Sequence, residues 1–197
     1  MCAVNPSKLS PALDEKQIGF IVKTIADETG LLLEIVNYNI RGQQYVCAGD
    51  WPQARSLHYL GQLLDSLQEP LSKLGEKLDW EDLVRSTLDQ IIPNTPKGPL
   101  SAMDLRRGSA TTPLQGLDVP FHSSFMRGGV AAFRGFLYAN VSIQDIDPSL
   151  LIGRYIPNLT AELFRIDKQY IESTWALTKS AVLGKILDQI IGSKRGY

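Results

Sequence analysis

The residues with the clearest potential for chemistry lie in one stretch, 116–129, where a histidine follows an apolar run and precedes two serines. The neutral imidazole of His122 can accept a proton near pH 7, which is what a general base requires. The pattern predicts His122 at the end of a buried strand, directly before a helix that begins near Gly128. The alternative interpretation is a structural histidine that hydrogen-bonds to its neighbours and performs no chemistry.

The chain offers no obvious nucleophile to accompany this base. Enzymes of the α/β-hydrolase fold hold a nucleophilic serine in a G-x-S-x-G turn between a strand and a helix, and the sequence contains no such pattern. Ser123 and Ser124 follow His122 directly, outside any turn of that kind. These positions argue against an independent hydrolase that uses Ser123 or Ser124 as its nucleophile, and this hypothesis ranks below the other functional hypotheses.

The composition excludes several classes of protein. Twenty basic residues stand against 21 acidic ones, so the net charge of −1 gives no reason to expect nucleic acid or a membrane surface as a partner. No apolar run approaches the roughly 20 residues of a membrane helix, and the first residues lack the features of a secretory signal. The 44% of apolar residues can build the core of one domain or of two small ones.

The two cysteines, Cys2 and Cys47, have no metal-ligand spacing around them, and no metal site is predicted. Cys47 is flanked by apolar residues in a β-like run and is predicted to lie in the core. Two thiols in a chain of this length suit a reducing compartment, so we expect the protein in the cytoplasm.

The first half of the chain predicts a β-α-β-β-α-β order of elements, which is the ferredoxin-like arrangement. A helix ends at Gly30, a glycine in the position of a C-cap, and a hairpin-like turn joins two β-like runs. The expected elements are an edge strand 1–4, helix 13–29, strands 31–38 and 43–48 joined by turn 39–42, helix 53–67 and strand 110–114.

Two regions of the chain have a weaker pattern. Residues 68–108 predict one more helix from Trp80 to Ile92, then a turn-rich piece, then a basic pair, Arg106 and Arg107. This pair is either a solvated loop or a contact for the phosphates of coenzyme A or phosphopantetheine. The second half predicts helix 128–138, a short helix 148–152 with Asp147 as N-cap, a strand leading into a loop at 155–160 and a largely helical segment 168–191.

Three stretches resemble a known family: V-P-F-H-S-S-F-M-R-G-G at 119–129, the paired runs 34–39 and 43–49, and I-P-N-L-T at 156–160. They look like the malonyl/palmitoyl transferase domain of the fungal-type fatty acid synthase beta subunit, a relative of the malonyl-CoA:acyl-carrier-protein transacylases. The resemblance implies an α/β (α+β) fold. A ferredoxin-like βαββαβ subdomain would cover 1–115, with a helical and loop insertion at about 68–108. The C-terminal part of an α/β-hydrolase-like acyltransferase body would cover 116–197.

The resemblance also implies a mechanism. In this family a serine in a G-x-S-x-G elbow attacks the thioester, and the histidine takes its proton and later returns it. His122 would be that catalytic base. The family places the serine, and an arginine for the malonyl carboxylate, before the ferredoxin-like subdomain. We therefore expect this chain to be a fragment of a longer chain, a dissected piece or a truncated gene product. Alone, it is expected to be inactive and prone to associate.

Five further residues are candidates for substrate binding. Phe121 precedes the histidine, where an aromatic ring accompanies malonyl selection in related modular acyltransferases because it fills the space of an α-methyl group. Asn37 and Asn39 lie in the resembling strands, Asn158 in the I-P-N-L-T run and Ser123 beside the base. The alternative is that the asparagines stabilise turns and that Ser123 caps a helix.

No cofactor is expected on this segment, and coenzyme A thioesters and phosphopantetheine are expected as substrates. The implied partners are acyl carrier protein, malonyl-CoA or acyl-CoA, the remainder of the beta subunit and the alpha subunit. The alternative function is a non-catalytic module that binds acyl carrier protein or assembles a complex. The missing serine favours that alternative and the histidine motif opposes it.

Overall fold

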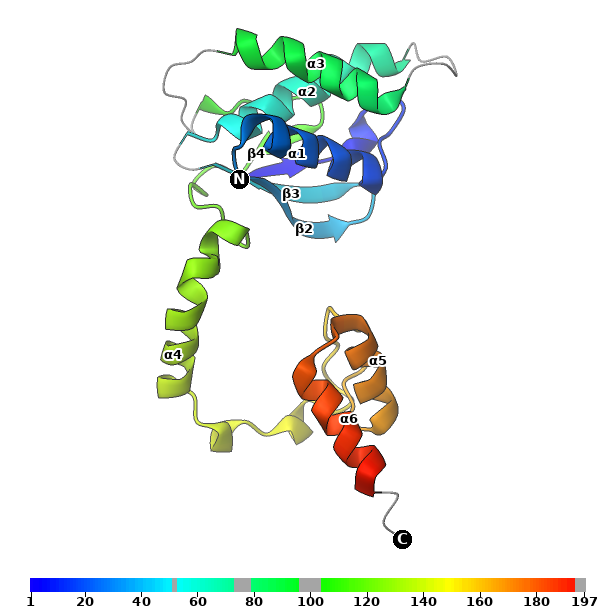
Figure 1. The fold of residues 1–197 in the computed structure, drawn as a ribbon, viewed down its shortest axis with the longest axis vertical. Helices are drawn as coiled ribbons and strands as arrows, with labels where there is room; N and C mark the ends of the chain where they lie inside the picture. Colours follow the sequence, from blue (N-terminus) through cyan, green and yellow to red (C-terminus); the bar gives the residue numbers. More distant parts are fainter. Residues whose placement is uncertain (51–52, 73–78, 96–103, 194–197) are drawn as a thin grey trace. The chain divides into compact units, whose positions relative to one another are not determined.

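The computed structural model describes residues 1–50, 53–72, 79–95 and 104–193. They form two compact units, Met1–Ala132 and Phe133–Tyr197, each of which is described by itself (Figure 1). The first unit is a small antiparallel sheet covered by helices, and the second is mainly helical. The division of the chain expected after residue 115 stays a prediction.

Four strands form the sheet in the order β2-β3-β1-β4, and each pairs antiparallel with its neighbours. They are β1 (Cys2–Val4), β2 (Leu33–Ile40), β3 (Gln44–Gly49) and β4 (Thr111–Pro113). The chain visits them in the order β1, α1, β2, β3, α2, α3, β4. The sequence placed β1 at an edge, and this was wrong, because both of its sides are occupied, by β3 and by β4.

Helix α1 (Glu15–Thr29) forms where the apolar spacing predicted it. The Asp14 side chain accepts a hydrogen bond from the backbone of Gln17, and the Gln17 side chain accepts one from the backbone of Asp14, which is a complete capping box. The apolar stripe, which includes Ile18 and Ile21, is fully buried. Gly30 ends the helix in the left-handed conformation, at φ +66°, where glycine has no steric penalty.

The predicted hairpin joins β2 and β3. Gly42 lies in its turn at φ +72°, and the backbone N–H of Gln43 donates to the carbonyl of Ile40. The pairing has two irregularities, one between Ile35 and Asn37 and one further along between Tyr38 and Ile40. Each irregularity leaves one extra residue on β2, and this interrupts the regular alternation of its side chains between the two faces of the sheet.

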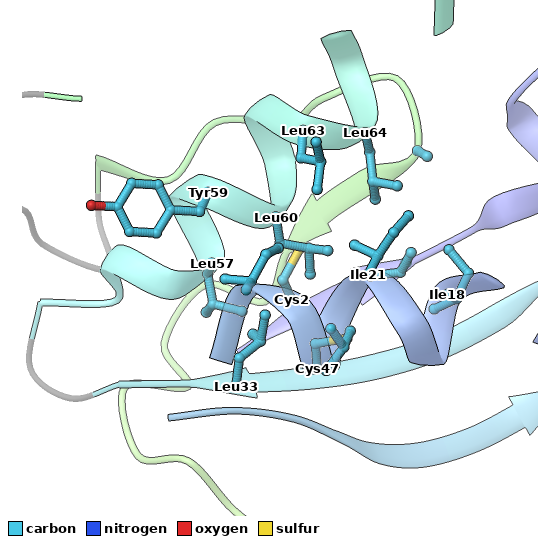
Figure 2. Packing of buried hydrophobic residues seen from close by; sticks show 14 of the residues in the cluster. Cys2, Ile18, Ile21, Leu33, Cys47, Leu57, Tyr59, Leu60, Leu63 and Leu64 are labelled. Atoms are coloured by element: carbon cyan, nitrogen blue, oxygen red, sulfur yellow. The ribbon is translucent and has the colours of Figure 1, made fainter. Parts of the chain in front are cut away.

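Helices α2 (Arg55–Ser72) and α3 (Trp80–Asn94) complete the first unit. The leucines that recur on one face of α2 are all buried, namely Leu57, Leu60, Leu64 and Leu67. Helix α2 runs past its predicted end at 67 and includes Pro70, and Pro93, which was expected in a turn, lies inside α3. The rest of that turn-rich piece, from 96, lies outside the described residues. Figure 2 shows leucines of α2 meeting side chains of α1 and the sheet in one cluster.

The second unit contains α5 (Lys168–Thr178) and α6 (Ala181–Ser193). These correspond to the single segment predicted at 168–191, which breaks at Lys179, a residue at φ +52°. Asp147 caps the short 3-10 helix Pro148–Leu150, as predicted, by accepting from the backbone of Ser149. The strand expected near 155–160 is wrong, because these residues form a loop and a turn. Within the described part of the chain, no helix has the length and apolar character needed to cross a bilayer.

Candidate functional site

His122 lies in a tight turn formed by residues 120–123. The backbone N–H of Ser123 donates to the carbonyl of Pro120 at 3.3 Å, and His122 occupies the third position with φ at +63°. The buried strand expected before this histidine was wrong, because residues 114–123 form turns and extended loop with no strand pairing. A run of β-like side chains makes a strand only where another strand offers its hydrogen-bonding groups. The imidazole is exposed in the first unit.

The conformation of His122 is costly. A left-handed third position is typical of a type II turn, where glycine or asparagine normally stands. A histidine held there stores of order 1–3 kcal/mol of strain, and such strain persists only where the surroundings impose it. Backbone strain of this kind gathers at functional sites. Ala54, Ala161 and Lys179 also have positive φ, and of these four described residues His122 is the one with an imidazole side chain.

Ser123 is part of what imposes the turn. Ser123 is 4% exposed, and its hydroxyl donates to the carbonyl of Pro120 at 2.6 Å. It takes the N-terminal position of the following 3-10 helix, Ser124–Gly129, but makes no capping hydrogen bond there. In this structure the Ser123 hydroxyl therefore stabilises the turn and is turned away from solvent, which also speaks against Ser123 as the nucleophile of a hydrolase.

Ser124 connects the turn to the sheet. Its backbone N–H donates to Oε2 of Glu34 on β2 at 2.8 Å, and its hydroxyl donates to Oε1 of the same carboxylate. The carboxylate at this helix start comes from Glu34, a residue that sequence reasoning missed. The available signal was a charged residue within the apolar run that precedes Asn37.

Phe121 is 43% exposed, and its backbone N–H donates to the carbonyl of Val119 at 2.9 Å. Its ring is outside the buried cluster of the first unit, so it is accessible beside His122. The 3-10 helix continues into α4 (Val130–Asn140), which corresponds to the helix predicted at 128–138.

The irregular hairpin brings Asn37 onto the strand face of Glu34. Glu34 lies opposite Ala48 and Asn37 lies opposite Val46, and alternate residues of β3 share one face of the sheet. Without the extra residue between Ile35 and Asn37, a spacing of three would place Glu34 and Asn37 on opposite faces. Asn37 is half-buried on the face that also carries the contact to Ser124.

The remaining two asparagines lie elsewhere. Asn39 is exposed and is the unpaired residue of the second irregularity in β2. Asn158 is exposed in a turn of the second unit, whereas the other candidates lie in the first. The structure thus relates Ser123, Phe121 and His122 within one turn and links that turn to the strand of Asn37.

The basic pair Arg106 and Arg107 borders a different hollow, of about 960 Å³, beside α2 and β4. Both side chains are exposed. Asp65 and Asp104 line the same hollow, so its charge is mixed. The Asp65 carboxylate also accepts a hydrogen bond from the backbone of Ser109 at 2.7 Å. The phosphate contact proposed for the two arginines stays a prediction.

The two thiols are buried and face each other across the β1–β3 pair. Burial raises the pKa of Cys2 from 9.0 to about 11, and burial also raises the pKa of Cys47. A thiol is a nucleophile or a metal ligand as the thiolate, so neither is activated. Among the described residues, no group of three or more histidine, cysteine or acidic side chains could hold a metal ion.

No family model matches the chain. Three of its relatives are the fatty acid synthase beta subunit TOXC of Cochliobolus carbonum, 45% identical over 183 residues, and the fatty acid synthase subunits beta of Gibberella zeae and Saccharomyces cerevisiae, 40% and 36% identical over 190 and 194 residues. The alignments cover 93–95% of this chain but only 8–9% of each relative. Over nearly all of its length, the chain is therefore homologous to one short segment of fungal fatty acid synthase beta subunits.

Proposed function

We propose that this chain is the histidine-bearing part of a malonyl/palmitoyl transferase domain. That domain would move malonyl and long-chain acyl groups between coenzyme A and acyl carrier protein, in the biosynthesis of fatty acids or of secondary metabolites derived from them. The observation that carries the proposal is His122, an exposed imidazole held in a strained left-handed turn by hydrogen bonds on both sides. The names of the relatives, all fatty acid synthase beta subunits, support the pathway.

The chemistry assigned to His122 is proton transfer. A serine supplied from outside this segment would attack the thioester carbonyl while the imidazole accepts the serine proton, and the same proton would then pass to the departing thiolate. The second half-reaction reverses these roles with the carrier-protein thiol. Because the sequence contains no G-x-S-x-G elbow, the isolated chain is expected to transfer no acyl group.

The fold supports this assignment. The antiparallel order β2-β3-β1-β4, with one helix between β1 and β2 and helices between β3 and β4, is the order of a ferredoxin-like subdomain. In the proposal this subdomain forms one wall of the acyl cleft, and the segment from 116 onward contributes to an α/β-hydrolase-like body. Phe121 would line the cleft and exclude an α-methyl group, at about 1–3 kcal/mol of discrimination against branched extenders.

The proposed partners follow from the reaction. They are acyl carrier protein, the coenzyme A thioesters, the remainder of the beta subunit and the alpha subunit, with a cytoplasmic location and no cofactor resident on this segment. The second candidate is a non-catalytic module that binds the carrier protein or assembles the complex. The engaged hydroxyls of Ser123 and Ser124 favour it over a hydrolase, because neither serine presents an unengaged nucleophile.

A segment exchange tests the proposal. The aligned segment of the Saccharomyces cerevisiae beta subunit is replaced by this chain, and the chimera is purified in its assembled complex. Transfer of labelled malonyl from malonyl-CoA to acyl carrier protein is then measured for the chimera and for its His122→Ala variant. The proposal expects transfer that falls at least 100-fold on substitution. Transfer that survives His122→Ala refutes the role of the base. Carrier-protein binding without transfer in either form favours the assembly module.

A further inference from the structure

We propose that Glu34 is a positioning residue for the acyl-transfer site, fixing the turn of His122 through the two donors of Ser124. The inference rests on the proposed function of His122. In the proposed function the sheet only forms one wall of the acyl cleft. Here a carboxylate on β2 would also determine the position of the imidazole.

The geometry is that of a carboxylate clamp. Both oxygens of Glu34 are used, Oε2 by the backbone N–H of Ser124 at 2.8 Å and Oε1 by its hydroxyl. An ionised carboxylate only accepts, so it matches a residue that presents two donors side by side. Hydrogen bonds to a charged acceptor are shorter and stronger than those between neutral groups.

The carboxylate clamp acts on a residue close to His122 in the chain. Ser124 is two residues after His122, and it begins the helical run that continues into α4. A negative charge at a helix start is also favoured by the partial positive charge of the unpaired N–H groups there. Glu34 therefore fixes the chain at the point where the turn ends and the helix begins.

Among the described residues, one other hydrogen bond links the stretch 116–129 to the sheet region: the N-terminal ammonium of Met1, next to β1, donates to the carbonyl of Leu117 at 3.2 Å. The hydrogen bonds that the described residues 118–129 make are otherwise internal, from Phe121 to Val119, from Ser123 to Pro120 and from Met126 to Ser123. The internal bonds define the shape of the turn, and the burial of Pro120 and Ser123 helps to hold it against the rest of the first unit. Glu34 supplies the hydrogen bonds that join the residues after His122 to β2, and displacement of a catalytic group by about 1 Å can lower a rate by about 100-fold.

The test uses the chimeric beta subunit described above, in its assembled complex. The variants are Glu34→Gln, which keeps the size of the side chain but loses one acceptor, Ser124→Ala, which removes the hydroxyl alone, and the double variant. Glu28→Gln is the matched control, because Glu28 is an exposed glutamate whose partner is Arg85 on α3. Both kcat and KM for malonyl-CoA are measured. Amide hydrogen exchange at Ser124 is measured in the same complexes.

We expect Glu34→Gln to lower kcat about 10- to 100-fold with KM changed less than twofold, and to speed exchange of the Ser124 amide. Ser124→Ala is expected to have a smaller effect in the same direction, since the backbone donor remains. The double variant should lose less than the product of the two single effects, because Glu34 and Ser124 act through one shared contact. Glu28→Gln should leave kcat, KM and exchange unchanged.

The possible failures are distinguishable. If Glu34→Gln keeps kcat within twofold while His122→Ala abolishes transfer, the positioning role is overturned and the proposed function stands. A loss of kcat without faster exchange at Ser124, or an equal loss in Glu28→Gln, also overturns it. If His122→Ala transfers normally, the proposed function fails and the role of Glu34 fails with it.

Discussion

Replacing His122 by glycine and by alanine tests whether the turn is held in a left-handed conformation. For a side chain with a Cβ atom, that conformation costs about 1–2 kcal/mol that glycine does not pay. Glycine in turn loses about 0.5–1 kcal/mol more conformational entropy than alanine on folding. The strain term is the larger, so His122→Gly should be more stable than His122→Ala by about 0.5–1 kcal/mol.

The matched control is Asp89, an exposed residue inside α3. There the backbone is right-handed, so the strain term is absent and only the entropic term acts, and Asp89→Gly should be less stable than Asp89→Ala by about 1 kcal/mol. The prediction is therefore a reversal of sign between two exposed positions of the same unit. The comparison of glycine with alanine at one site cancels the loss of the original side chain.

The assay is urea unfolding followed by tryptophan fluorescence. In a Trp51→Phe/Trp175→Phe background the remaining tryptophan is Trp80, in α3 of the first unit, so the signal reports that unit. Midpoints are compared at equal slope, since a change of slope would mean a change in the unfolded state. If alanine at 122 is as stable as glycine or more stable, the left-handed turn and the strain attributed to His122 are refuted.

Three further predictions concern stability. Leu60→Ala, at a fully buried position of α2, should lower the free energy of unfolding by about 2–5 kcal/mol. Ile40→Ala, at a side chain 51% exposed, should lower it by less than about 1 kcal/mol. Equal urea midpoints for the two variants would contradict the assigned core. Asp14→Ala should lower the free energy of unfolding by about 1 kcal/mol, because it removes the cap of α1. Asp14→Asn should keep most of that stability, because the amide oxygen still accepts the hydrogen bond. Circular dichroism during thermal unfolding measures the stability of both variants, and an alanine variant as stable as the unsubstituted chain would argue against the cap. Burial raises the pKa of Cys2 from 9.0 to about 11 and raises that of Cys47 as well, so the stability that the neutral thiols contribute is complete below pH 9 and is lost as the pH rises through about 11. The fall in urea midpoint between pH 8 and pH 10.5 should therefore be smaller in the double variant Cys2→Ala/Cys47→Ala than in the unsubstituted chain. An identical fall in both would show that the thiols are not responsible.

Local signals predicted local structure well. Helix α1 was predictable because the apolar spacing and Gly30 both act within a few residues of the backbone they organise. The hairpin and α3 were predictable for the same reason. The extension of α2 through Pro70 was not, since prolines are usually read as helix ends.

Features that depend on distant partners were missed. Strand β1 was placed at an edge because three residues followed by Asn5 and Pro6 give no sign that two strands will flank them. The segment before His122 was read as a strand because its side chains are β-like, and the lack of a pairing partner is invisible in the sequence. Periodicity describes a segment, whereas pairing is a property of two segments.

The candidate site divides in the same way. His122 and Phe121 were found because a short contiguous motif contains them. Glu34 was missed because its partner, Ser124, lies 90 residues later in the chain. The shared face of Glu34 and Asn37 depends on an irregular pairing that a strict two-residue alternation excludes.

The central position of β1 has a consequence for synthesis on the ribosome. The partner on one side, β3, emerges soon after β1, but the partner on the other side, β4, begins only at Thr111, 62 residues after β3 ends at Gly49. At 5–20 residues per second this interval lasts about 3–12 s. Throughout it, β1 presents an open row of backbone donors and acceptors to any passing strand. One side of β1 in the nascent first unit therefore stays open to wrong pairing while α2 and α3 are being made.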